Sequence, residues 1–310
     1  MRRLLLTLIC LASPATAGDL AFVTSQNGNA LSVVDLDSLS IVASAPIPDA
    51  PAPVAYDAAT GRVYVIAANS GRLHVLDQEA RTLAQADLGE GAFGLAVAAH
   101  RGVFVTDWYG ATLTRLDSQL ASVWRSDTGA APAGVAVSDD GTFVATADRD
   151  ADAVSIFDAA TGQLLHRVPT AGPHPFGVTF HKGMFFTADV QGNSVTVIDP
   201  VAGQRVGQIE TGSHPYAVAF AGGRGFVTNQ YASSVTVFDP ESLEVLEEVA
   251  VGDYPEGIAP LPDGTGVAIA NWDSDSLVIL DAASLTIRDE ITMPSGPRAF
   301  GAFTGRPAPQ

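Results

Sequence analysis

Four polar side chains with distinct chemistry recur at one interval in the second half of the chain. His174, His214, Tyr254 and Arg298 are separated by 40, 40 and 44 residues. Imidazoles can form hydrogen bonds or bind a metal ion, a phenol can donate or accept, and a guanidinium pairs with carboxylates. The spacing is typical of a structural repeat and is not a zinc motif. These residues predict a polar site that neighbouring repeats assemble together.

A second group of polar and aromatic residues lies at another repeated position, in loops that follow a short β-rich run. Trp108 and Trp272 occupy equivalent places in two of these loops, and acids or amides stand in others. Aromatic faces beside amides and carboxylates suit a polar organic ligand or a protein loop. Together the two groups predict a ligand-binding site, with no catalytic residue assigned, that consists of His174, His214, Tyr254, Glu256, Arg298, Trp108, Asp148, Asp189, Gln230 and Trp272.

The repeat itself is visible in a short phrase of two mostly apolar residues followed by aspartate. It occurs seven times, ending at Asp35, Asp77, Asp117, Asp158, Asp199, Asp239 and Asp281, so the intervals are 42, 40, 41, 41, 40 and 42 residues. A period near forty is typical of β-propeller blades. Because each aspartate stands just before a turn on a different repeat, we expect it to accept backbone hydrogen bonds there and not to form a catalytic or metal set.

Within one repeat, residues 184–224 contain four short β-rich runs separated by turn residues. The sequence therefore predicts an all-β fold, a seven-bladed β-propeller with four antiparallel strands per blade. The chain from Gly18 onward opens with a second-type strand at 21–24 and closes with a lone first-type strand at 299–303. We expect this C-terminal inner strand to join the three N-terminal strands and to close the ring.

Several of these segments resemble one known family. Phe226-Val227-Thr228-Asn229 followed by Ser234–Asp239, together with Val103–Thr106 and Asn193–Asp199, is similar to the repeats of YVTN-type β-propellers. The resemblance covers essentially all of the chain beyond the N-terminal segment. It implies the propeller fold. Family members serve as binding, surface and accessory proteins, and propellers of similar appearance include enzymes.

The blades differ from one another on one face only. Loops before the first strand and between the second and third strands emerge on the same face of a propeller, and here they are unlike from blade to blade. The loops expected on the opposite face are plain turns such as 57–61 and 158–162. Function should lie where the blades differ, around one mouth of the channel.

The residues leave several ligand chemistries open. His174 and His214 are weak candidates for a shared metal ion, completed by Tyr254, Glu256 or a loop aspartate, or for ligands to a non-covalent tetrapyrrole. The segment Asp148–Asp152 begins like a calcium loop but lacks the glycine and the later glutamate of that motif. The cofactor therefore stays unknown. His74, His100, His166 and His181 are expected to be structural.

Charge and the N-terminal segment bound the setting of the protein. The chain carries 16 Lys and Arg against 34 Asp and Glu, a net charge of −18, which disfavours nucleic acid. Residues 1–17, with two arginines, a short apolar stretch and an Ala15-Thr16-Ala17 cleavage site, resemble a signal peptide, and 18–310 form the propeller. The only cysteine, Cys10, lies in the signal. We expect a periplasmic or secreted protein that does not insert into membranes.

These observations favour an exported, non-catalytic binding or accessory protein that holds a small polar ligand, a cofactor or a partner protein. No nucleophile elbow, zinc-protease motif, phosphate loop or dinucleotide fingerprint is present in the sequence. One alternative is a lactonase-like or metal-dependent hydrolase that uses Glu256, His214 and Arg298. Another is an accessory protein for a periplasmic redox enzyme that handles haem or quinone.

The signal-peptide prediction can be checked by mass. The protein recovered from the export compartment of its host should begin at Gly18, because signal peptidase cleaves after small residues such as those at positions 15 and 17. Intact-mass and N-terminal peptide analysis give the answer. A protein that retains residues 1–17 would refute the prediction.

Overall fold

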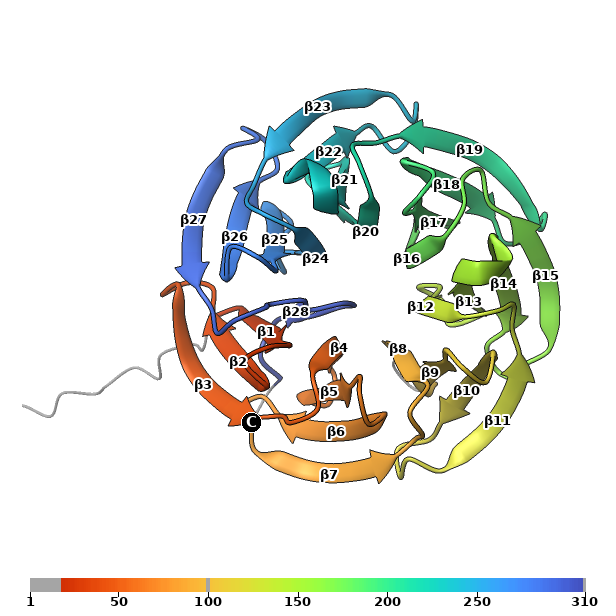
Figure 1. The fold of residues 1–310 in the computed structure, drawn as a ribbon, viewed down its shortest axis with the longest axis horizontal. Coiled ribbons are helices and arrows are strands. Elements are labelled where there is room, and N and C mark those ends of the chain that lie inside the picture. Colours follow the sequence, from red (N-terminus) through yellow and green to blue (C-terminus); the bar gives the residue numbers. More distant parts are fainter. Residues whose placement is uncertain (1–17, 99–100, 309–310) are drawn as a thin grey trace, which may run out of the picture.

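A computed structural model describes residues 18–98 and 101–308, so the expected signal peptide and His100 lie outside the described part. Seven sheets of four antiparallel strands each surround a central axis like the blades of a propeller (Figure 1). The predicted all-β seven-bladed architecture is confirmed. The described residues contain two helices, the three-residue 3-10 helices Arg149–Ala151 (η1) and Gln230–Ala232 (η2). Neither is long enough to cross a membrane.

We number the blades 1 to 7 in the order in which the chain builds their inner strands. From the channel outward, blade 1 consists of β4 (Pro51–Asp57), β5 (Arg62–Ala67), β6 (Arg72–Asp77) and β7 (Thr82–Asp87), and blade 2 of β8 (Ala92–Ala98), β9 (Gly102–Asp107), β10 (Thr112–Leu116) and β11 (Ser122–Asp127). Blade 3 consists of β12 (Pro132–Val137), β13 (Phe143–Asp148), β14 (Ala153–Asp158) and β15 (Leu164–Pro169), and blade 4 of β16 (Pro175–His181), β17 (Met184–Asp189), β18 (Ser194–Asp199) and β19 (Gln204–Glu210). Blade 5 consists of β20 (Pro215–Ala221), β21 (Arg224–Asn229), β22 (Ser234–Phe238) and β23 (Val245–Ala250), and blade 6 of β24 (Pro255–Pro260), β25 (Gly266–Asn271), β26 (Ser276–Asp281) and β27 (Ile287–Thr292). Blade 7 combines the C-terminal β28 (Thr304–Gly305) with the N-terminal β1 (Leu20–Ser25), β2 (Ala30–Asp35) and β3 (Ser40–Pro46).

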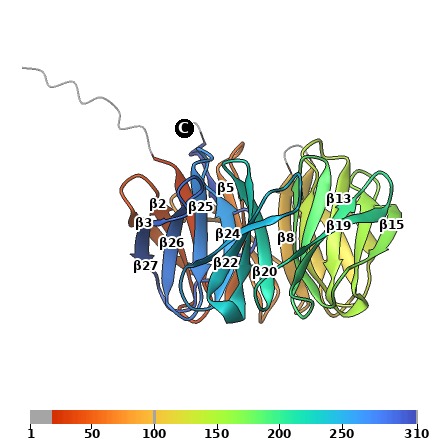
Figure 2. The ribbon, with the colours of Figure 1, turned by 90° about the horizontal axis from the view of Figure 1, so that it is seen from above.

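The two ends of the propeller differ in the loops that they carry. The loops before each inner strand and between the second and third strands lie at one end, which we call the loop face and which carries η1 and η2. The other two turns of each blade form the turn face, and the two ends are seen side-on in Figure 2. On the turn face, Asp158 Oδ1 accepts from the backbone N–H of Ala160 at 3.0 Å and of Thr161 at 2.8 Å. The other six repeated aspartates also accept from the backbone N–H two residues on, so their expected structural role is observed.

A threonine at the end of the second strand links neighbouring blades. In blade 5 the hydroxyl of Thr228 donates to the Glu256 carbonyl of blade 6 at 2.8 Å and accepts from the Ala217 N–H of its own blade at 3.1 Å. Thr106 and Thr24 make the same two contacts in blades 2 and 7. Since the residue is fully buried, this hydroxyl satisfies two backbone groups that water does not reach. In blades 2, 5 and 7 this threonine therefore ties the blade to the next one.

Small residues let the inner strands pack closely around the axis. A Cβ atom added to Gly134 would lie 2.5 Å from the carbonyl oxygen of Phe176 in the next blade, and one added to Gly177 would lie 2.4 Å from that of Tyr216. The register of each inner strand from β4 to β24 also shifts across this point, as between Pro132 and Val135. Such a bulge turns one side chain out of the usual alternation. The bulge directs one residue toward the axis, and in β8, β12, β16 and β24 this residue directly precedes the glycine.

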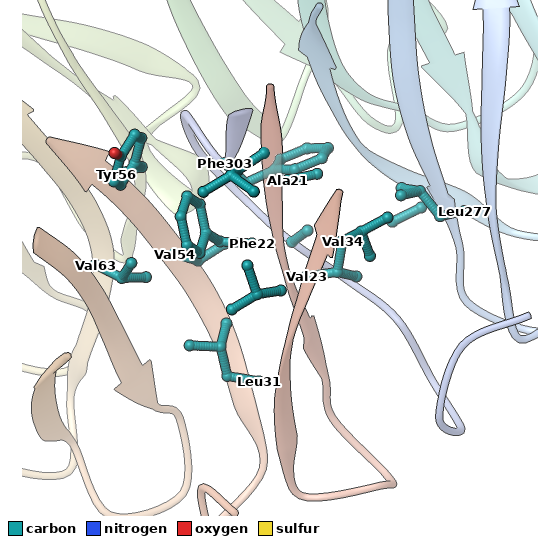
Figure 3. Packing of buried hydrophobic residues seen from close by; sticks show 14 of the residues in the cluster. Ala21, Phe22, Val23, Leu31, Val34, Val54, Tyr56, Val63, Leu277 and Phe303 are labelled. Carbon is teal, nitrogen blue, oxygen red and sulfur yellow. The ribbon is translucent and has the colours of Figure 1, made fainter. Parts of the chain in front are cut away.

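The C-terminal segment closes the ring, as predicted, but in a different form from the expected strand at 299–303. Only Thr304–Gly305 (β28) forms a ladder with β1. The preceding residues bond to two blades at once, because the Phe303 carbonyl accepts from Phe22 of β1 at 2.7 Å while the Phe300 carbonyl accepts from Val54 of β4 at 2.8 Å. Phe303 is fully buried beside Phe22, Val54 and Tyr56 (Figure 3). A buried phenylalanine contributes about 2 kcal/mol, which holds the two ends of the chain together.

The threonine contact predicts a specific difference between two similar substitutions. Thr228→Val keeps the shape of the side chain but leaves the Glu256 carbonyl and the Ala217 N–H without their partner, so it should lower the free energy of unfolding by about 1–3 kcal/mol. Thr187→Val is the matched control, because the Thr187 hydroxyl is also buried but has no hydrogen-bond partner. The control should be neutral or stabilising. Denaturant unfolding measures the free energy of unfolding of wild type and both variants. An equal decrease in the two variants would contradict the proposed link between blades.

Candidate functional site

Three of the predicted site residues share one backbone conformation at the loop face. His174, His214 and Tyr254 have φ angles of 59°, 57° and 53°, in the left-handed region that side chains rarely adopt. In each, the carbonyl accepts from the N–H of the following loop of the same blade at 2.9 Å. The repeated geometry brings the loop before the inner strand together with the loop between the second and third strands, as the sequence alignment predicts.

Arg298 reaches the same region by a different route. Its backbone N–H donates to the Thr24 carbonyl at 2.9 Å, and the left-handed residue is Ala299, with a φ of 45°. The C-terminal segment therefore enters the ring one residue out of step with the other blades. This shift places the guanidinium beside the carboxylate of Glu256.

Glu256 and Arg298 form a buried ion pair at the loop-face end of the channel. The Arg298 Nε and Nη2 atoms donate to the two oxygens of Glu256, the second at 3.2 Å, and the carboxyl side chain is 2% exposed. Gln230 donates to the same carboxylate at 2.6 Å, and Arg298 Nη1 donates to the Gln26 oxygen at 2.9 Å. Burial raises the pKa of Glu256, while the Arg298 charge and the hydrogen bonds oppose that shift. The network joins four strands or loops from blades 5, 6 and 7.

Next to this network, aromatic rings form a continuous arc on the loop face. His214 stacks on Tyr231 at 4.0 Å between ring centres, Tyr231 lies 5.5 Å from Tyr254, and Tyr254 lies 6.2 Å from Trp272. Tyr231 and Tyr254 are 58% and 37% exposed. We call these four residues the aromatic arc. An exposed run of large rings with polar edges is typical of binding surfaces.

At the axis a second group of rings, from blades 2, 4, 5 and 7, comes together. Phe176 lies 5.8 Å from Phe93, 5.3 Å from Phe300 and 4.6 Å from Tyr216. Phe93, Phe176 and Tyr216 lie within the register shifts of β8, β16 and β20. Phe300 belongs to the C-terminal segment and directly follows the left-handed Ala299. We call these four residues the aromatic layer. Trp108 contacts this layer through Phe93, at 5.6 Å, so it covers the layer on the loop-face side.

Two predicted site residues lie inside the blades. Asp148 and Asp189 are both fully buried, at the ends of β13 and β17. Asp189 Oδ2 accepts from the Gly172 N–H at 3.2 Å and from the Thr196 hydroxyl at 2.7 Å, and Asp148 makes the matching contacts in blade 3. A ligand on the loop face cannot touch them. Both carboxylates fix the loop before the inner strand, as Asn229 does in blade 5 through Thr236.

The remaining predicted ligand residues occupy separate surroundings. The backbone N–H of His174 donates to Asp152 Oδ1 at 2.8 Å, and its buried Nδ1 atom has no partner among the described residues. In the calcium-like segment, Asp148 is buried and Asp150 pairs with Arg149, so its carboxylates point to different partners. Within residues 18–98 and 101–308, no group of three His, Cys, Asp or Glu side chains is placed to hold a metal ion.

Sequence reasoning missed the aromatic layer, Tyr231 and Gln26. The sequence contains a signal for the layer. Phe176, Tyr216 and Phe300 each stand two residues after His174, His214 and Arg298, and Phe93 stands two residues after Gly91, the equivalent residue of blade 2. Glu256 occupies the same position after Tyr254 in blade 6. No repeated pattern identifies Tyr231 or Gln26, which belong to loops of unlike composition.

Comparisons with known proteins agree with this architecture. A family model described as YNCE-like β-propeller matches residues 107–265. No curated protein matches the chain. Among solved structures, a protein of unknown function from Desulfotomaculum acetoxidans DSM 771 has a TM-score of 0.78 at 16% identity, covering 94% of this chain and 100% of that one.

Two further solved structures are similar in fold. Hydrazine synthase from Kuenenia stuttgartiensis has a TM-score of 0.72 at 15% identity, covering 80% of this chain and 88% of that one. The dihydro-heme d1 dehydrogenase NirN in complex with DHE has a TM-score of 0.70 at 16% identity, covering 95% and 76%. At such low identity the likeness shows the fold alone.

Burial of Asp189 predicts a pH-dependent stability effect. Desolvation raises the pKa of Asp189 to about 7 from 3.8, so between these values the folded chain holds a proton that the unfolded chain has lost. Stability from this group therefore falls as pH rises through that window. Asp189→Asn, which copies the natural residue of blade 5, should stabilise the protein at pH 8 by on the order of 2–4 kcal/mol relative to its effect at pH 4.

Denaturant unfolding of wild type and variant at both pH values measures this difference. Glu90→Gln, which removes one exposed carboxylate, is the control for the change in net charge. An Asp189→Asn effect that is the same at pH 4 and pH 8 would show that the buried carboxyl does not titrate in this range.

Proposed function

As the chain belongs to the YNCE-like β-propeller family, we propose that it is an exported, non-catalytic binding protein of the periplasm or the secreted fraction. Its loop face holds a small polar ligand, a cofactor or a loop of a partner protein. The site consists of the aromatic arc, His174 and the surface above the Glu256–Arg298 pair. Export rests on the signal-like residues 1–17.

The exposed aromatic arc is the observation that carries this proposal. Two tyrosines, Tyr231 and Tyr254, keep 58% and 37% of their surface exposed although they contact other rings on both sides. Tyrosine and tryptophan supply large contact areas with few rotatable bonds, and they dominate the energetics of many interfaces. An arc of such rings from two adjacent blades suits a ring compound with polar edges or an extended protein loop.

The buried ion pair below the arc supports a binding role over acid–base hydrolysis. Both oxygens of Glu256 accept hydrogen bonds, from Arg298 and Gln230, and the side chain is 2% exposed. A general base must reach the proton that it removes. Glu256 instead serves as a fixed acceptor that orients Arg298 and Gln230 beneath the site.

The proposal predicts which side chains hold the ligand. Protein isolated from its native host without denaturation should carry a bound small molecule or partner, detected by native mass spectrometry. The double variants Tyr231→Ala/Tyr254→Ala and His174→Ala/His214→Ala should each weaken that binding by about 30-fold or more, since hot-spot side chains contribute about 2 kcal/mol each.

The matched control lies on the turn face, where Val201→Ala removes an apolar side chain that is 76% exposed. This variant should keep the bound species. A wild-type protein that carries no bound species, or arc variants that retain it as fully as Val201→Ala does, would overturn the site assignment.

A further inference from the structure

A second compartment lies on the propeller axis, on the turn-face side of the aromatic layer. It has a volume of about 360 Å³ and is bounded by Phe93, Phe176 and Phe300 at one end and reaches His181 at the other. None of the residues of the aromatic arc lines it, and neither do Glu256 and Arg298. We call this compartment the chamber. It is separate from the loop-face site.

The side chains that line the chamber are almost all apolar. Gly, Ala, Val, Phe, Pro, Leu and Ile make up the wall, and only Thr179 and His181 carry polar side-chain atoms. The Thr179 hydroxyl already donates to the Val218 carbonyl at 2.7 Å. Burial, reinforced by the Lys182 charge, lowers the pKa of His181, which favours the neutral imidazole near pH 7. A charged ligand would lose its hydration here without gaining a charged partner.

The backbone leaves room for a limited number of polar contacts. Each inner strand from β4 to β24 lies at the end of its sheet, so one of its edges faces the axis and not another strand of that blade. Such edges present N–H and C=O groups. A neutral hydroxyl or carbonyl group of a ligand can therefore be accommodated within an otherwise apolar wall.

The size of the chamber limits the ligand further. An apolar cavity of about 150 Å³ is known to hold one benzene molecule. The chamber, at about 360 Å³, is more than twice that size. Aromatic rings lie at both ends, with the layer on one side and His181 stacked on Phe220 at 3.9 Å between ring centres on the other. This arrangement suits flat rings.

We propose that the chamber binds a neutral, largely apolar compound of about two fused rings with one hydroxyl or carbonyl substituent, and that His181 contacts this substituent at the turn-face entrance. The rings occupy the space among Ala96, Ala136 and Ala219, where the wall is formed by small side chains. The aromatic layer prevents the ligand from passing to the loop face.

Titration calorimetry with 2-naphthol tests the proposal, with 2-naphthoate as the charged counterpart on the same ring system. 2-Naphthol should bind with saturation at one site and with a negative heat-capacity change, and 2-naphthoate should bind at least tenfold more weakly. Ala136→Phe, which fills the chamber, should abolish binding, while Ala202→Phe on an exposed turn should not. His181→Ala should weaken the binding of 2-naphthol but not that of naphthalene.

Should Ala136→Phe fail to fold, Ala96→Leu fills the chamber with a smaller side chain and is expected to weaken binding at least tenfold. Tyr231→Ala/Tyr254→Ala should leave 2-naphthol affinity unchanged, which separates this site from the one on the loop face. Absence of saturable 2-naphthol binding, equal affinity for 2-naphthoate, or undiminished binding by a folded chamber-filling variant would each overturn the proposal.

Discussion

The structure depends on how closely seven inner strands can approach one axis. Backbone groups at that distance must be satisfied, and the hydroxyl of Thr228 and its counterparts Thr24 and Thr106 do so by bonding two blades at once. Glycines such as Gly134 and Gly177 remove the Cβ atoms that would collide with the neighbouring carbonyl. Packing at the axis therefore restricts the residue type at these threonine and glycine positions. The neighbouring positions of the inner strands are free to differ from blade to blade.

That variation divides the channel. The bulge of each inner strand from β4 to β24 turns one side chain toward the axis, and in blades 2, 4 and 5 this side chain is aromatic. In blade 7, Phe300 of the C-terminal segment contacts these rings without a bulge. The rings of Phe93, Phe176, Tyr216 and Phe300 meet across the axis. One side holds the polar network of Glu256 and Arg298 with the aromatic arc, and the other holds an apolar chamber. A single architectural constraint thus produces two surroundings of opposite polarity.

The sequence predicted the fold well because the period near forty repeats the same buried and turn residues in every blade. It also predicted that His174, His214 and Tyr254 occupy equivalent places. It did not predict that Asp148 and Asp189 are buried, because a carboxylate before a loop looks the same whether it faces solvent or accepts hydrogen bonds inside a blade. The aromatic layer was missed for a similar reason. A bulge reverses the alternation from which inward and outward positions are read.

The central claim is that the aromatic layer separates the polar loop-face site from the apolar chamber. A crystal structure determined under xenon pressure tests this most directly, since xenon enters apolar cavities that water leaves empty. We expect xenon to bind between Phe176 and His181. We expect no continuous row of ordered water molecules through the layer of Phe93, Phe176 and Phe300. A continuous chain of water from the Glu256–Arg298 pair to His181 would contradict it.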